Sequence, residues 1–116
     1  MSLPKLSAEQ TPEEFEKLLE QARKASDLLK ALSHEGRLLI LCLLAEGEKS
    51  VSELETIMKM PQAAVSQQLA RLRFDRLVNT RREGRVIYYS IASTEVSSVI
   101  STLYELFCAP VRKNDR

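Results

Sequence analysis

The sequence has few of the residues on which most catalytic and metal centres depend. Its 116 residues include one histidine, two cysteines and three glycines, and there is no tryptophan. No Gly-rich phosphate loop is present, and no nucleophile has a visible partner base. These absences argue against an enzyme, and we expect no cofactor.

Long apolar runs and a secretion signal are also missing. The longest apolar stretch, Leu38–Ala45, is far too short to span a membrane. The first residues lack the basic start and apolar run of a signal peptide. We therefore expect a cytoplasmic protein with no membrane partner, in which two cysteines do not form a structural disulfide framework.

The composition is that of one globular domain, and the charge is unevenly spread. Apolar residues make up 44% of the chain and charged residues 28%, with a net charge of +1. Residues 9–20 carry five Glu and one Lys, whereas residues 71–85 carry six Arg against Asp75 and Glu83. A local basic excess of this kind suits a surface that contacts phosphates.

The sequence between Glu53 and Leu72 predicts two short helices joined by a tight turn at Met60-Pro61. The second helix, residues 61–73, has an apolar stripe and an opposite face without carboxylates. That face consists of Gln62, Ala63, Ser66 and Gln67, with Arg71 near its edge. Short polar side chains, amides and arginines reach base edges in the major groove. This stretch alone fits a helix-turn-helix and an ordinary helical hairpin equally well.

The segments before the helical pair predict two further helices and the start of the pair itself. Thr11-Pro12-Glu13-Glu14 is typical of a helix start. The apolar stripe that follows covers about 20 residues, more than one core needs, so part of it is expected to meet a partner subunit. Ser33 is expected to cap a buried helix over residues 34–46 that Gly47 ends, and the motif at residues 50–53 predicts the start of the next helix.

The remaining segments complete the expected domain. A last helix is expected from Ser93 or Thr94 until Pro110 stops it. We expect a flexible N-terminal arm over residues 1–10, a DNA-binding and dimerisation domain over residues 11–109, and a polar tail over residues 110–116.

Two stretches after the helical pair predict a β-hairpin. Residues 77–82 and 85–91 are rich in β-branched and aromatic side chains, and Gly84 lies at the turn between them. The resulting order predicts a mainly α winged helix-turn-helix with a small β-hairpin and an extra helix at each end. Arg81, Arg82 and Arg85 then lie near the wing tip, where arginines contact phosphates or enter the minor groove. The alternative is a solvated hairpin tip.

Two stretches resemble the ArsR/SmtB repressors. They are ALSHEGRLLILCLL and SVSELETIMKMPQAAVSQQLARLRFDRLVNTRREGRVIYYSI, and the likeness covers about residues 25–108. The resemblance implies a homodimer joined by the first and last helices, which binds palindromic operator DNA and releases it when an inducer binds. By position, Gln62, Ala63, Ser66 and Gln67 match the base-reading face of this family, and the wing arginines match its backbone contacts.

Both common metal sites of that family are missing here. Val51-Ser52-Glu53-Leu54 has no thiol where a Cys-x-Cys pair stands in the family, and residues 93–108 contain neither Asp nor His. The single His34 lies beside a helix cap, which is more typical of a structural or solvent residue. The two cysteines alone provide fewer ligands than a zinc site requires. We therefore expect no metal.

The two cysteines have an inert and a reactive interpretation. Free cysteines are commonly small buried hydrophobes. The positions of Cys42 and Cys108 nevertheless resemble the SqrR/BigR-type subgroup, which responds to persulfides and polysulfides. The resemblance implies a redox-sensing repressor that leaves DNA when reactive sulfur species join Cys42 and Cys108 through a disulfide or polysulfide bridge. The alternatives are a metal or metalloid sensor with an irregular thiol site and a constitutive DNA-binding module.

Overall fold

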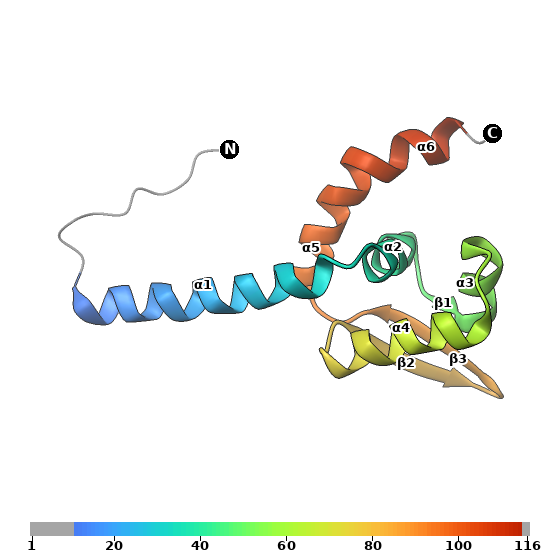
Figure 1. Ribbon diagram of the computed structural model, residues 1–116, viewed down its shortest axis with the longest axis horizontal. Helices are drawn as coiled ribbons and strands as arrows, with labels where there is room; N and C mark the ends of the chain where they lie inside the picture. Colours follow the sequence, from blue (N-terminus) through green and yellow to red (C-terminus); the bar gives the residue numbers. More distant parts are fainter. Residues whose placement is uncertain (1–10, 115–116) are drawn as a thin grey trace. The chain divides into compact units, whose positions relative to one another are not determined.

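The computed structural model describes residues 11–114, which divide between two units, Met1–Lys30 and Ala31–Arg116 (Figure 1). The arm expected over residues 1–10 lies outside the described residues. Within residues 11–114, none of the helices has the length and apolar character needed to cross a membrane.

Helix α1, Pro12–Leu32, begins as its sequence predicts. The Thr11 amide donates a 3.2 Å hydrogen bond to the Glu14 carboxylate, and the Glu14 amide donates one of 3.1 Å to Thr11 Oγ1. This reciprocal pair satisfies backbone groups that a helix start would otherwise leave open. The apolar side chains of α1 are largely exposed, with Phe15 at 54% and Leu29 at 63%.

Helix α2, Glu35–Leu44, lies at the centre of the second unit, and all of its residues from Ile40 to Leu44 are buried. Its ends differ from expectation. The residue at the N-terminal cap is His34 rather than Ser33, and the helix ends before Gly47, with Ala45 at the cap. The Glu46 and Gly47 amides bond to the Leu43 and Leu44 carbonyls, three residues back, so the chain tightens into a 3₁₀-like turn where the helix ends.

The helix-turn-helix consists of α3, Val51–Met58, and α4, Gln62–Phe74. Ser50 and Glu53 form the predicted capping box. Lys59 adopts a left-handed conformation (φ 54°) after α3, and the extended Pro61 caps α4, which therefore starts one residue later than predicted. The predicted apolar stripe of α4 is confirmed, because Val65, Leu69 and Leu72 are fully buried.

The wing is part of a three-stranded antiparallel sheet with the order β1-β3-β2. Its strands are β1, Lys49–Ser50, β2, Val78–Glu83, and β3, Val86–Ile91. Glu83 pairs with Val86, so Gly84 and Arg85 form the turn, and Gly84 takes the positive φ of 64° that this hairpin requires. The sequence predicted β2 and β3 but not β1, which has only two residues and no pattern of its own.

The last helical segment continues past the expected stop at Pro110. Helix α5, Thr94–Leu103, starts at the predicted Ser93 cap and leads into a π-helix, η1, Tyr104–Cys108, and then α6, Ala109–Asn114. The Ala109 amide bonds to the Tyr104 carbonyl, five residues back, in the wide turn of a π-helix. Pro110 therefore lies in the first turn of α6, where its missing N–H is tolerated. The expectation that Pro110 ends the helix is wrong.

Candidate functional site

The side chains predicted to read bases lie on the outer face of α4. Gln62, Ala63 and Gln67 are exposed and Ser66 is half-buried, opposite the buried apolar stripe of the same helix. The separation follows from the helical period, which carries residues three and four apart to one side. Arg71 is exposed on this helix and donates a 3.2 Å hydrogen bond to Asp75.

The start of α4 and the wing turn meet on one surface. Gln62 and Arg85 both line a depression of about 240 Å³, together with the first residues of α3. Two of the predicted DNA-contacting residues, one from the helix and one from the wing, are thus brought together by the fold. This arrangement lets one duplex contact both elements at once.

Arg81 occupies a different environment from the other wing arginines. Its guanidinium bonds to Glu48 at 2.5 and 3.2 Å and to Glu83 at 2.7 Å, and it lies 4.7 Å from the centre of the Tyr88 ring. The hydrogen bonds from Arg81 hold the pKa of Glu48 below its usual value. The two carboxylates offset the charge of Arg81, whereas Arg82 and Arg85 are exposed near the turn.

Cys42 and Cys108 are brought into contact by the fold. Cys42 lies on α2 and is only 4% exposed, while Cys108, the last residue of η1, is half-buried. Burial raises the pKa of Cys42 to about 12, and the adjacent Cys108, which is hydrogen-bonded to it, adds to this rise. Cys42 is therefore a protonated thiol at neutral pH, and both cysteines are free.

The two thiols lie in the wall of an apolar cavity of about 260 Å³. Residues of α2, α3, η1 and α6 line it. Its apolar side chains are Leu39, Leu43, Ile57, Met58, Phe107 and Val111, and Tyr104, Arg112 and Glu46 form its polar edge.

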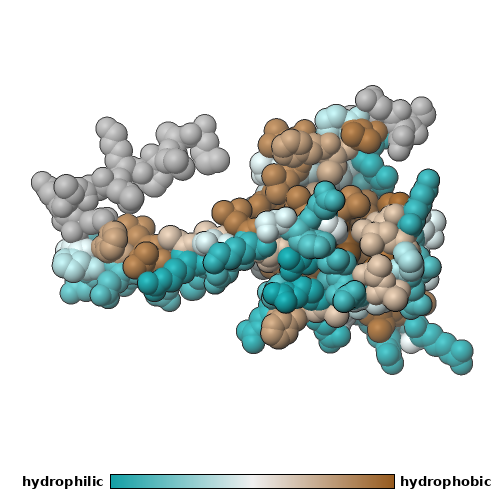
Figure 2. Space-filling model, viewed as in Figure 1, coloured by the Kyte–Doolittle hydropathy of each residue, from teal (hydrophilic) through white to brown (hydrophobic). Residues whose placement is uncertain are grey.

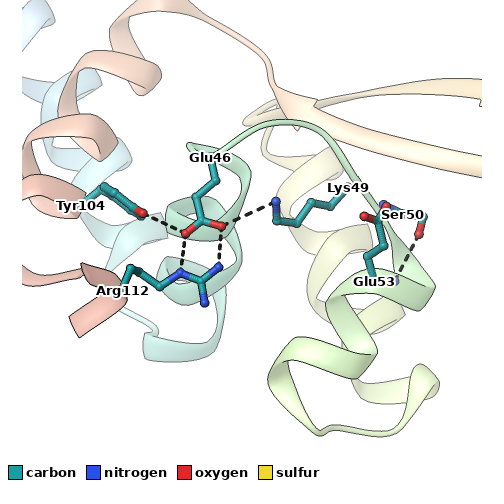
Figure 3. A network of polar contacts seen from close by, with 6 residues as sticks. All are labelled: Glu46, Lys49, Ser50, Glu53, Tyr104 and Arg112. Carbon is teal, nitrogen blue, oxygen red and sulfur yellow. Dashed lines mark hydrogen bonds and ion pairs between the residues drawn. The ribbon is translucent and has the colours of Figure 1, made fainter. Parts of the chain in front are cut away.

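A cluster centred on Glu46 closes the polar edge of the cavity (Figure 3). The Glu46 carboxylate accepts hydrogen bonds from the Tyr104 hydroxyl at 2.9 Å and from Arg112 Nε and Nη2 at 2.7 and 2.8 Å. Lys49 Nζ lies 3.7 Å from the same carboxylate. Burial opposes ionisation of Glu46, but these donors together outweigh it and lower the pKa of the carboxyl. Sequence reasoning missed this cluster, because its members come from distant segments.

A metal centre is not visible among residues 11–114, which hold no group of three or more His, Cys, Asp and Glu side chains placed to bind an ion. His34 is exposed at the start of α2. The positions of the two family metal motifs thus carry no ligand cluster in the described part of the chain.

A helix-turn-helix followed by an arginine-bearing wing defines a winged helix-turn-helix regulator of transcription. Residues 34–80 match the family described as "Bacterial regulatory protein, arsR family". The chain belongs to the ArsR family.

Individual relatives agree with this assignment. The chain is 44% identical over 97 residues to the transcriptional activator HlyU of Vibrio cholerae, covering 84% of this chain and 90% of HlyU. It is 44% identical over 90 residues to the biofilm growth-associated repressor of Agrobacterium fabrum, covering 78% and 77% of the two chains. The solved structure of the repressor BigR from Xylella fastidiosa is 40% identical and superposes with a TM-score of 0.76, covering 82% and 94%.

The comparisons confirm the resemblance to the ArsR/SmtB repressors and to BigR, and with it the winged helix-turn-helix fold. The family and these relatives are regulators of transcription rather than enzymes. One relative is an activator and another a repressor, so the family establishes regulation through DNA binding but not its direction.

Proposed function

We propose that the protein is a cytoplasmic homodimeric repressor of transcription that reactive sulfur species release from operator DNA. Persulfides or polysulfides join Cys42 to Cys108 through a disulfide or polysulfide bridge. The observation that carries this proposal is the contact between the two thiols in the wall of one apolar cavity. Neither cysteine is already bridged, and Cys108 is partly open to solvent.

Operator DNA is bound by α4 and the wing. Gln62, Ala63, Ser66, Gln67 and Arg71 contact base edges and flanking groups of the major groove, while Arg81, Arg82 and Arg85 serve the backbone and minor groove. The exposure of Arg82 and Arg85 supports their contact with phosphates. Arg81 contributes less to phosphate binding, because Glu48 and Glu83 already pair with its guanidinium. Repression is proposed because the biofilm growth-associated repressors of Agrobacterium fabrum and Xylella fastidiosa are among the relatives, although the activator HlyU is as similar.

The dimer uses the apolar faces of the first and last helical segments. Phe15 and Leu29 of α1 and Leu106 and Phe107 of η1 are each more than half exposed. Large apolar side chains exposed on a helix are typical of an interface. A second copy that covers them places the two recognition helices in successive major grooves, about 34–36 Å apart.

Cys108 reacts first, because a thiolate is the attacking species and Cys42 is buried and protonated. The Cys108 thiolate attacks the outer sulfur of a persulfide RSSH, forms Cys108–S–SH and expels RS⁻. The Cys42 sulfur then attacks Sγ of Cys108 and breaks its bond to the outer sulfur. Hydrosulfide leaves, takes up the Cys42 proton as hydrogen sulfide, and a disulfide remains. If a second RSSH first lengthens the persulfide to Cys108–S–S–SH and leaves as RSH, Cys42 attacks the middle sulfur, hydrosulfide leaves in the same way, and a trisulfide remains.

The test is an operator-binding assay on reduced, glutathione persulfide-treated and peroxide-treated protein, with mass spectrometry of the same samples. We expect the persulfide to link the Cys42 and Cys108 peptides and to release DNA, and the Cys42→Ser and Cys108→Ser variants to stay bound. Undiminished DNA binding with no linked peptide would overturn the proposal.

Two alternatives give different results when the same assay also includes protein treated with a thiol-binding metal ion. A metal or metalloid sensor takes up a thiol-binding ion stoichiometrically and releases DNA on doing so. A constitutive DNA-binding module responds to none of the treatments, and replacing both cysteines by serine changes nothing.

A further inference from the structure

We infer that Glu46 is a positioning residue that couples the cysteine pair to the DNA-reading elements. Residues 46–50, here called the linking segment, run from the end of α2 to the start of α3. The inference rests on the proposed function, since it concerns how a bridge between Cys42 and Cys108 changes DNA affinity.

At one end, the linking segment is fixed to the helices that carry Cys108. Glu46 accepts hydrogen bonds from Tyr104, four residues before Cys108, and from Arg112, four residues after it. Cys42 in turn lies four residues before Glu46. Four residues make about one helical turn. The thiol contact and the Glu46 cluster are therefore neighbouring contacts between the same two segments.

At the other end, the linking segment is fixed to the wing and to α3. Lys49 and Ser50 pair with Tyr89 and Tyr88 of β3, and Ser50 also caps α3 through Glu53 (Figure 3). Glu48, which precedes Lys49 in this segment, accepts a hydrogen bond from the guanidinium of Arg81 in β2.

The Glu46–Lys49 pair is partly shielded from water, whereas Arg112 at the other side of the cluster is 44% exposed. The side chains of Glu46 and Lys49 are only 17% and 13% exposed, so water screens their ion pair less than a pair on the open surface. Glu46 therefore touches both the Cys108 segment and the strand that leads into the helix-turn-helix. The Glu46 carboxylate thus connects Tyr104 and Arg112, beside Cys108, to Lys49 of β1.

A sulfur bridge changes the separation between the segments that carry Cys42 and Cys108, and the Glu46 hydrogen bonds connect these same segments. A disulfide holds its sulfurs about 2.05 Å apart, closer than two free thiols approach, and a bridge with extra sulfur atoms fixes the two cysteines at another separation. The Glu46 hydrogen bonds of 2.7–2.9 Å lie one turn away, and such bonds weaken beyond about 3.2 Å. Either bridge therefore shifts the partners of Glu46, and Lys49 and the start of α3 follow.

The test compares the operator dissociation constants of reduced and bridged protein. Bridging with glutathione persulfide is completed and verified by mass before DNA is added, so that altered reaction rates do not enter. We expect the ratio of the two constants to lie between about 5 and 150 for the unaltered protein, the range typical of coupled sites. For Glu46→Ala we expect a ratio below about 3, because one end of the link is removed.

Two further variants test why the ratio of dissociation constants falls in Glu46→Ala. Glu46→Gln keeps one acceptor oxygen without the charge, and we expect an intermediate ratio. Glu105→Ala removes an exposed carboxylate from the same π-helix, and we expect the ratio of the unaltered protein. A purely structural role of Glu46 lowers the melting temperature and weakens DNA binding by both forms equally, which leaves the ratio unchanged.

The outcomes separate the inference from the proposed function. A ratio near one in the unaltered protein overturns the proposed function. A clear ratio in the unaltered protein that Glu46→Ala fully retains overturns the inference alone. If Glu46→Ala does not fold, Tyr104→Phe removes one hydrogen bond to Glu46 and keeps the ring. A reduced ratio then supports the inference, and an unchanged one overturns it.

Discussion

The DNA-reading surface and the cysteine site are built in different ways. The outer face of α4 comes from one helix of 13 residues, and its buried stripe repeats at the helical period. The cysteine site joins α2, η1, α6 and the linking segment, whose residues lie far apart in sequence. In Figure 2 much of the visible surface of the second unit is polar, whereas both thiols lie in the wall of an apolar cavity. Local periodicity therefore specifies the outer face of α4, whereas tertiary packing brings the two cysteines together.

The largest expected difference between these regions is in the stability lost when a leucine of each is replaced by alanine. Leu69→Ala removes a fully buried side chain beneath the outer face of α4 and should lower the free energy of unfolding by about 2–5 kcal/mol. Leu39→Ala, in the cysteine cavity, removes a side chain that is 44% exposed and should cost less than about 1 kcal/mol. Urea denaturation measures both. Equal losses would show that the cysteine cavity is packed as tightly as the helix-turn-helix.

The second prediction separates base reading from general affinity. Gln67 is exposed on α4, and its amide suits an adenine edge. Gln67→Ala should weaken binding to the operator by about 1–3 kcal/mol and leave binding to unrelated duplex DNA nearly unchanged. Fluorescence anisotropy with the two duplexes provides the measurement. An equal loss on both would assign Gln67 to general affinity instead.

The third prediction tests the difference between two wing arginines. Arg85 is exposed at the turn, and Arg85→Ala should lower the slope of operator affinity against salt concentration by about one. Arg81 is held by Glu48 and Glu83, so Arg81→Ala should change this slope less. Binding titrations at several salt concentrations give the slopes. Equal slopes for the two variants would mean that Arg81 exchanges its carboxylates for phosphate on DNA.

The fourth prediction concerns alkaline pH and the buried thiol. Because burial raises the pKa of Cys42 to about 12, the folded chain keeps this proton at pH values where the unfolded chain has lost it. Above the ordinary thiol pKa, near about 8.5, the unfolded state therefore binds fewer protons, and stability falls with rising pH until about pH 12. Urea denaturation across this range should show a shallower fall for Cys42→Ala. An identical fall would locate the effect in other groups.

Sequence reasoning predicted most of the fold because its signals are local. The capping boxes at Thr11 and Ser50 and the stripe of α4 each lie within a few turns, and all were found in the structure. Strand β1 was missed because pairing with β3, and not its two residues, creates it. The stop assigned to Pro110 was wrong because Pro110 lies in the first turn of α6, directly after the π-turn, where its missing N–H is tolerated.

The candidate site was predictable only in part for the same reason. Cys42 and Cys108 were singled out by resemblance, yet no local pattern places them in contact. Glu46, Tyr104 and Arg112 were not predicted as a cluster. The spacing of eight residues between Tyr104 and Arg112 indicates one side of a helix, but nothing in the sequence directs that side to Glu46.

The smallest expected effect compares the helix caps of the two regions. Ser50 starts α3 with two reciprocal hydrogen bonds to Glu53, whereas Ser93 starts α5 with one, from the Val96 amide. Ser50→Ala should cost about 1–2 kcal/mol of stability and Ser93→Ala about 0.5–1 kcal/mol. Each removes one hydroxyl acceptor, but Ser50 is only 6% exposed, so water replaces its hydroxyl less readily. Ser50 also lies in the linking segment, so Ser50→Ala should weaken operator binding more than its stability loss explains, while Ser93→Ala should not. Urea denaturation and operator titration of both variants give the comparison. Equal effects on DNA binding would mean that the start of α3 does not couple the proposed cysteine site to the DNA-binding surface.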